Sequence, residues 1–144
     1  MNNLNKYINK LENHKLEDHQ KKRIEIIVER LYNKINSISL IVFICTHNSR
    51  RRQFCEAWSK VLANRYGLNI SFSSAGTTKT SVYKEVINSL KRAGVDINEK
   101  GILNIEGKSS TLFSKTLDDI KENKFISITT CTCLLYTSDA ADDL

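Results

Sequence analysis

SLIVFIC, residues 39–45, passes directly into THNSRRR, residues 46–52. Residues 39–45 form a continuous apolar run rich in β-branched residues and predict a strand buried on both faces, as in parallel sheets. A helix is predicted over residues 51–66, where apolar residues recur at helical spacing and Gly67 is placed to end it. The inward face of this helix consists of Phe54, Ala57, Trp58, Val61 and Leu62. The stretch therefore predicts a buried strand, a short loop and a helix.

The alternation of strand and helix continues along the chain. Further strands are predicted over residues 70–74, 111–114 and 125–130, and helices over residues 81–93 and 117–122. Gly94 is placed to end the helix over 81–93. Alternating strands and helices predict an α/β fold with a doubly wound parallel sheet.

The two ends of the chain differ from this central part. Residues 1–36 predict one amphipathic helix packed on the domain. Its apolar positions are Leu16, Ile24, Ile27, Val28, Leu31, Tyr32 and Ile35. At the other end, CLLYTSDAADDL (residues 133–144) resembles the conceptual translation of a transposon-based sequencing adapter. We therefore expect a helical extension over 1–37, a partial α/β domain over 38–132 that is incomplete at its C-terminal side, and a non-native tail over 133–144.

The composition argues against a membrane protein, an exported protein, a metal protein and a nucleic-acid-binding protein. The chain is 40% hydrophobic and 26% charged, and it has no apolar run long enough to cross a bilayer and no apolar signal core, so a cytoplasmic location is expected. Its four cysteines have neither CxxC nor zinc-ligand spacing and are expected to be reduced thiols, without a metal or cofactor. The net charge is +6, but the lysines are dispersed, so nucleic acid is not an expected partner.

The junction after Cys45 has the features of an anion site. Backbone N–H groups of a loop between a strand and a helix can converge on an anion, and the helix dipole adds positive charge. We predict that the amides over Thr46, His47, Asn48, Ser49, Arg50 and Arg51 bind a phosphate-like oxyanion. A cysteine at the start of such a loop is stabilised as the thiolate, which makes Cys45 the candidate nucleophile. Arg51, at the first turn of the helix, can offer a bidentate guanidinium to the oxyanion.

These motifs resemble a known family. Residues 41–62 are similar to the low-molecular-weight protein tyrosine phosphatases and the related thioredoxin-coupled arsenate reductases, whose loop typically reads C-T-G-N-S-C-R-S. Two later motifs, Ser73–Thr77 (SSAGT) and Gly94–Ile97 (GVDI), also match. The resemblance covers about residues 1–132, and the loop C-T-H-N-S-R-R together with the helical N-terminal extension looks like a bacterial subgroup. It implies a flavodoxin-like, three-layer αβα domain that hydrolyses phosphate monoesters, such as phosphotyrosine in proteins, through a cysteinyl-phosphate intermediate.

The chain departs from the family pattern in several places. His47 stands where the family usually has Gly, Arg50 replaces a second cysteine, and Arg52 replaces the serine that normally hydrogen-bonds the thiolate. The family's general acid is an aspartate in an Asp-Pro loop, and this chain contains no proline. Asp118 and Asp119 lie elsewhere in the pattern and are not assigned that role. We therefore expect impaired catalysis from the chain as written.

Two alternatives remain open from the sequence. An arsenate reductase would use the same anion pocket and then relay a disulfide through further cysteines to thioredoxin. Cys131 resembles the first relay cysteine of such enzymes, so it is a possible redox residue. The second alternative is a basic binding module without catalysis, which would spread its arginines over one face instead of gathering them after a cysteine.

Overall fold

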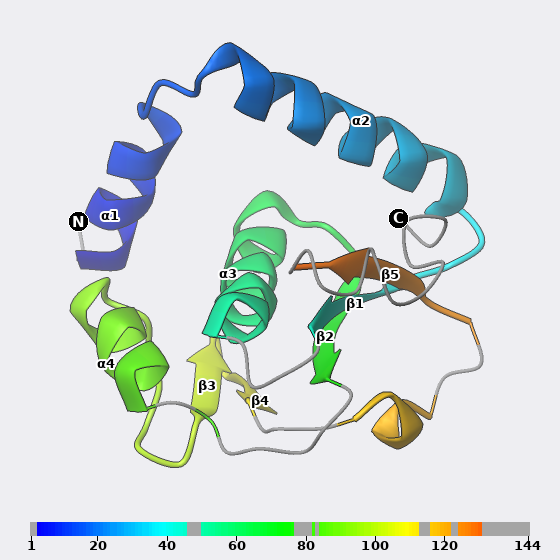
Figure 1. The fold of residues 1–144 in the computed structure, drawn as a ribbon. Helices are drawn as coiled ribbons and strands as arrows, with labels where there is room; N and C mark the ends of the chain where they lie inside the picture. Colours follow the sequence, from blue (N-terminus) through cyan, green and yellow to red (C-terminus); the bar gives the residue numbers. More distant parts are fainter. Residues whose placement is uncertain are drawn as a thin grey trace.

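The computed structural model describes residues 3–45, 50–76, 82, 84–112, 116–121 and 124–130. The predicted tail over 133–144 lies outside these residues. In chain order the elements are α1 (Asn3–Glu12), α2 (Asp18–Lys34), β1 (Leu40–Cys45), α3 (Arg50–Tyr66), β2 (Ser71–Gly76), α4 (Lys84–Arg92), β3 (Ile102–Ile105), β4 (Lys108–Thr111), the 3-10 turn η1 (Leu117–Asp119) and β5 (Ile126–Thr129). Figure 1 shows their arrangement.

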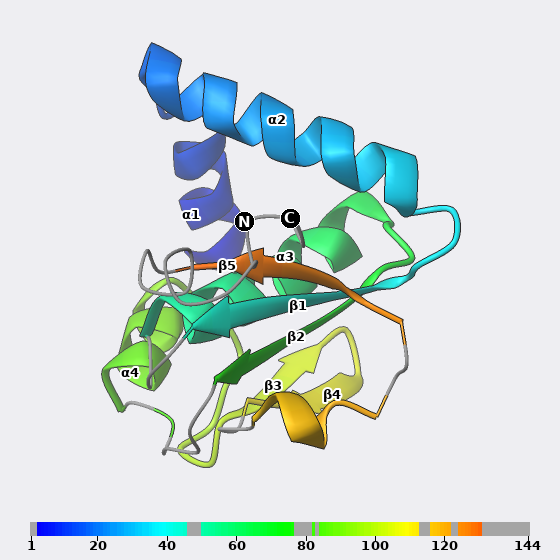
Figure 2. The ribbon, with the colours of Figure 1, turned by 45° about the vertical axis from the view of Figure 1, so that its right-hand side comes forward.

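The central sheet has the strand order β2-β1-β5, and both pairs of strands are parallel. Figure 2 shows β1 between its two neighbours. All six residues of β1 are buried, which confirms the sequence prediction of a strand covered on both faces. The parallel sheet with its flanking helices is a flavodoxin-like α/β fold, as predicted.

The two faces of β1 enter different parts of the core, because successive side chains of a strand point to opposite faces. Ile41 and Phe43 pack with Ile126 of β5 and with Cys55 of α3. The same cluster includes Leu31 and Ile35 at the C-terminal end of α2 and Phe72 of β2. The opposite face is covered differently, since Leu40, Val42, Ile44 and Ala75 pack against Ile120 and Phe125.

A further hydrophobic cluster lies on the other side of α3. It joins α1, α3, α4 and the β3–β4 hairpin through Ile8, Ala57, Val61, Val86, Ile87, Leu90, Val95, Ile97, Leu103 and Leu112. The predicted inward residues of α3 are present in this cluster, with Phe54, Trp58 and Leu62 packed at its margin. α3 is therefore covered on both sides, and this holds its first turn in place at the end of β1.

The N-terminal extension differs from the prediction. The chain forms two helices in place of one, and the second begins at a capping box in which the Glu17 backbone N–H donates to Oε1 of Gln20 at 2.9 Å. No residue of α2 is buried, and Tyr32 is 76% exposed. The sequence predicted that the apolar positions of the extension pack along the domain. For α2 this prediction was wrong except at its C-terminal end, where Leu31 and Ile35 contact the core. Glu17 and Gln20 were the sequence signal for the second helix.

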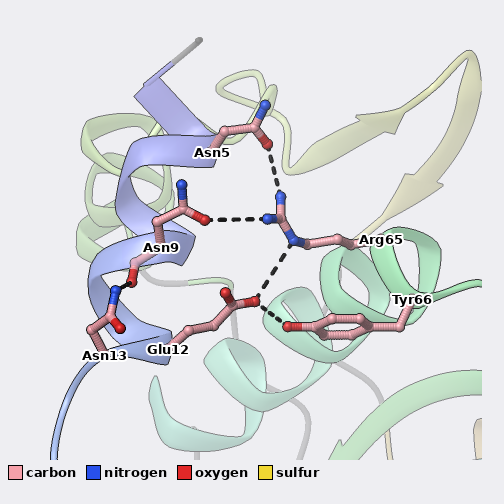
Figure 3. Close-up of polar contacts among 6 residues, drawn as sticks. All are labelled: Asn5, Asn9, Glu12, Asn13, Arg65 and Tyr66. Atoms are coloured by element: carbon pink, nitrogen blue, oxygen red, sulfur yellow. Dashed lines mark hydrogen bonds and ion pairs between the residues drawn. The ribbon is translucent and has the colours of Figure 1, made fainter.

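The first helix makes the main contact between the extension and the domain. Tyr7 of α1 stacks on Trp58 of α3 with ring centroids 5.4 Å apart. Arg65 of α3 donates hydrogen bonds to the side-chain oxygens of Asn5 at 2.9 Å and Asn9 at 3.3 Å, as Figure 3 shows. These contacts fix α1 against α3.

The sequence interpretation did not find the β3–β4 hairpin, for which no strand was predicted between the helix over 81–93 and residue 111. The two strands pair antiparallel around Glu106 and Gly107, whose φ angles are +48° and +84°. Two consecutive positive φ values are characteristic of a type I′ hairpin turn, which favours glycine. The predicted strand over 111–114 corresponds only to the end of β4, and residues 113–114 lie outside the described residues.

Candidate active site

Cys45 is the last residue of β1 and lies beside Gly76 of β2 in the parallel register. Its residue surface is 5% exposed. Because it shares the strand face of Ile41 and Phe43, its side chain is directed to the side of the sheet that α3 covers. Carboxyl ends of strands in open parallel sheets are the usual place for ligands in this type of fold. The predicted nucleophile is therefore at the expected edge of the sheet.

The predicted anion loop lies largely outside the described residues. Thr46, His47, Asn48 and Ser49 are among those not described, and of Arg50 the structure describes only its backbone, as the first residue of α3. Cys131, the predicted relay cysteine, is also outside. The roles assigned to these residues stay predictions.

Arg51 and Arg52 are adjacent in α3 but have different surroundings. Arg51 is exposed, and its charge acts on Cys55. Burial raises the pKa of the Cys55 thiol, and Arg51 opposes that effect. Cys55 packs in the cluster of Ile41 and Phe43, as expected for a structural thiol.

Arg52 has no exposed surface. Burial lowers the pKa of its guanidinium, while Cys45 and Glu56 act in the opposite direction by electrostatic attraction. The guanidinium nevertheless stays charged at neutral pH, because arginine begins from so high a pKa. Cys45 is thus one of the groups that act electrostatically on the buried Arg52 guanidinium.

Glu56 is 1% exposed and is held by two side chains. The hydroxyl of Ser74 in β2 donates to its Oε1 at 2.6 Å, and Nζ of Lys60 donates to its Oε2 at 2.7 Å. Lys60 also donates to the hydroxyl of Ser110 in β4 at 2.5 Å. This network was not found from the sequence. The spacing of Arg52, Glu56 and Lys60, each four residues apart on one helix face, was the available signal.

One aspartate near the sheet, Asp119, has a structural role. Asp119 accepts hydrogen bonds through Oδ2 from the backbone N–H of Thr116 at 2.9 Å and from its hydroxyl at 3.3 Å. Thr116 itself forms a parallel bridge to Gly76. Asp119 thus caps the η1 turn, which agrees with leaving it out of the predicted catalytic residues.

Among the described residues, no group of three or more His, Cys, Asp or Glu side chains is arranged to hold a metal ion. Over the same part of the chain, no helix has both the length and the hydrophobicity that a bilayer crossing requires. Two surface hollows, of about 410 Å³ between α1 and the domain and about 460 Å³ beside β2, are not lined by Cys45, Arg51 or Arg52.

Comparison with known proteins identifies the family. Residues 40–112, about half of the chain, match the family model described as low molecular weight phosphotyrosine protein phosphatase. The matched segment begins with β1 and includes Cys45, α3 and β2. No curated protein matches the chain. The chain belongs to the low molecular weight phosphotyrosine protein phosphatase family.

Proposed function

We propose that the chain is a protein tyrosine phosphatase that hydrolyses phosphate monoesters through a cysteinyl-phosphate on Cys45. Family membership supports a phosphatase function in general. The observation that carries the specific proposal is the position of Cys45, at the carboxyl end of the central strand and five residues before the start of the 17-residue helix α3. A thiolate in this position is stabilised by the positive end of the α3 helix dipole, which is equivalent to about half an elementary charge.

The proposed reaction has two steps. The Cys45 thiolate attacks phosphorus, the bond from phosphorus to the leaving oxygen breaks, and the phosphoryl group is transferred to sulfur. Water then attacks the cysteinyl-phosphate, which releases inorganic phosphate and returns the thiolate. The amides of residues 46–51 and the guanidinium of Arg51 stabilise the charge on the equatorial oxygens in both steps. No cofactor takes part in this scheme.

Arg51 is exposed and therefore accessible to a phosphate that arrives from solvent. Its planar guanidinium can bind two oxygens at once, which a lysine ammonium cannot do. The substrates that fit this chemistry are phosphotyrosine in a protein or a small phosphate-like oxyanion. We propose a cytoplasmic location, where the thiol stays reduced.

A second candidate, arsenate reduction, is favoured by one observation. The backbone N–H of Thr130 donates to the carbonyl oxygen of Ile44 at 2.8 Å, so the residues preceding Cys131 and Cys45 in sequence are in contact. In this alternative Cys45 attacks arsenate and displaces one of its oxygens as water, and the Cys131 thiolate then attacks the Cys45 sulfur. Arsenite leaves with the electron pair, a disulfide forms, and thioredoxin is the external reductant that restores the thiols.

The test compares the 144-residue chain with Cys45→Ser and, as a matched control, Cys55→Ser. Serine is not ionised at neutral pH, so Cys45→Ser should lose turnover of an aryl phosphate and still bind phosphate, while Cys55→Ser should keep turnover. Turnover by Cys45→Ser would exclude Cys45 as the nucleophile. Arsenate-dependent oxidation of thioredoxin that is lost in Cys131→Ser would favour the reductase instead.

A further inference from the structure

A hollow of about 460 Å³ lies where β2 begins, between that strand, the second half of α3 and the β3–β4 hairpin (Figure 2). Its volume is in the range of sites that hold a small molecule or a few residues of a peptide. Two of the described residues that line the hollow are lysines, and none of them is acidic. The hollow therefore has the charge that suits an anionic ligand.

The two lysines, Lys60 and Lys108, come from different elements to the same side of the hairpin. Nζ of Lys60 in α3 donates to the hydroxyl of Ser110 in β4 at 2.5 Å. Lys108 is two residues before Ser110 in the same strand, so the two side chains are on one face of the hairpin. Both lysines therefore lie on the hairpin face that is turned toward α3.

Lys60 has a donor left for a ligand. An ammonium group has three N–H donors, and Lys60 uses one on Oε2 of Glu56 at 2.7 Å and one on Ser110. Its side chain is 19% exposed, so the remaining donor is accessible from the hollow. Glu56 is buried and offsets one of the two lysine charges. With Lys108 exposed, the hollow keeps a net positive charge.

The outer edge of β2 supplies backbone groups at the same place. The N–H of Ser71 donates to the carbonyl oxygen of Ser39 at 2.8 Å, so the backbone groups of Ser71 face β1. Backbone groups of successive strand residues point to opposite sides, so those of Phe72 face away from β1. Within the described residues, that edge of β2 is paired only at its far end, where Gly76 bridges to Thr116.

Apolar side chains complete the hollow. Leu68 is 52% exposed and lines it together with Ile70 and Ile105. An inorganic anion would leave this apolar surface uncovered, and a nucleic acid would not pair with a strand edge. An extended peptide uses all three features, because its backbone pairs with the edge while its side chains contact the apolar surface and the lysines.

We propose that this hollow is a docking site for an extended acidic peptide segment of a partner protein. The peptide backbone pairs with the outer edge of β2 at Phe72, an apolar side chain covers Leu68, and carboxylates bind Lys60 and Lys108. The site is separate from the proposed active site and does not depend on the proposed function. Ser71 lies five residues, or about 16 Å along the strand, from Gly76, which pairs with Cys45.

The experiment measures the Kd of a labelled peptide, Val-Glu-Val-Asp-Val-Glu-Val blocked at both ends, for the full 144-residue chain by fluorescence anisotropy. A second peptide has Gln and Asn in place of Glu and Asp. A third has methyl groups on its three central backbone nitrogens, which removes the N–H donors needed for strand pairing. The protein variants are Lys108→Glu and, as a matched control, Lys22→Glu, which changes an exposed lysine of α2 that does not line the hollow.

We expect the acidic peptide to bind, and its Kd to rise at least tenfold in Lys108→Glu but to stay within about threefold in Lys22→Glu. The amide peptide and the methylated peptide should each bind the original chain at least tenfold more weakly than the acidic peptide. These two comparisons use the original chain, so they hold even if Lys108→Glu does not fold. Turnover of nitrophenyl phosphate should be the same in Lys108→Glu as in the original chain.

Absence of binding at peptide concentrations up to about 1 mM would overturn the inference. Equal loss of affinity in Lys22→Glu and Lys108→Glu would overturn it too, because the attraction would then come from the charge of the whole protein. Undiminished binding of the amide peptide or of the methylated peptide would remove the carboxylates or the strand pairing from the site. Binding of an oligothymidylate but not of the peptide, with loss in Lys108→Glu, would assign the hollow to nucleic acid instead.

Discussion

Thr130 donates two hydrogen bonds to one oxygen, the carbonyl of Ile44, from its backbone N–H at 2.8 Å and from its hydroxyl at 3.1 Å. This contact joins the end of β5 to the end of β1, one residue before Cys45. The carboxyl end of β1 is thereby fixed on one side by β5 and on the other by the pairing of Cys45 with Gly76. The end of β1 that carries Cys45 is thus held by contacts with both neighbouring strands.

Replacement of Arg51 by lysine should strongly reduce activity. The variant Arg51→Lys keeps the positive charge but loses the planar pair of donors that fits two phosphate oxygens. We expect kcat for an aryl phosphate to fall about 100-fold or more, similar to removal of one donor from an oxyanion site. Steady-state kinetics test this, with Arg92→Lys as the control. A decrease of less than about threefold would exclude Arg51 as the bidentate phosphate ligand.

Gly94 of the domain lies in close contact with helix α1 of the N-terminal extension. Replacement of this glycine should therefore destabilise the protein. Its φ angle is +95°, and a Cβ at this position would lie 2.5 Å from the backbone nitrogen of Leu4 in α1. We expect Gly94→Ala to lower the free energy of unfolding by about 3 kcal/mol, from the strained φ and the clash together.

Gly107 is the matched control for Gly94. Its φ angle is +84°, and a Cβ there would meet no atom within 4 Å. Gly107→Ala should therefore cost only the conformational strain, about 1–2 kcal/mol. Urea unfolding of the two variants gives the comparison. Equal losses of stability would mean that α1 is not seated on Gly94 in solution.

The Cys55 thiol should make stability depend on pH in alkaline solution. Burial raises its pKa above the ordinary value of 9.0, so the folded state retains the proton at a pH where the unfolded state loses it. Stability from this group is therefore present below pH 9.0 and is lost as the pH rises above that value. Urea unfolding of the original chain and of Cys55→Ala should show a stability difference that shrinks above that pH. A difference that stays constant with pH would contradict burial of the thiol.

The chain as written should prefer substrates with good leaving groups. It has no proline and so no Asp-Pro loop to supply the family's general acid. We expect the catalytic factor from such an acid, about 10²–10⁴-fold, to be missing for phosphotyrosine and to matter less for nitrophenyl phosphate. Comparison of kcat/KM for the two substrates tests this. Equal values would show that another group in the chain protonates the leaving oxygen.

The sequence predicted the fold best where burial decides the structure. β1 and α3 were predicted almost to the residue, because a continuous apolar run and a regular apolar helix face leave few alternatives. The extension was harder, since Ile24 and Val28 have helical spacing yet are exposed in α2. Periodicity alone does not reveal whether an apolar face has a partner to cover it.

The candidate site was predicted only in part. The position of Cys45 followed from the predicted strand before it and the predicted loop after it. The network of Glu56, Ser74 and Lys60 joins three elements that are distant in the chain, so its contacts could not be derived from local spacing. Which of two neighbouring arginines is buried likewise depends on the packing of α3 against the sheet.

The most direct test of the account is the identification of the covalent intermediate. The 144-residue chain is mixed with nitrophenyl phosphate, quenched in acid during turnover, and digested with trypsin. We expect the peptide 35–50, which contains Cys45, to gain the mass of one phosphoryl group, and the peptide 53–60, which contains Cys55, to remain unmodified. Turnover with no phosphoryl group on the Cys45 peptide, or with the group on another cysteine, would contradict the account.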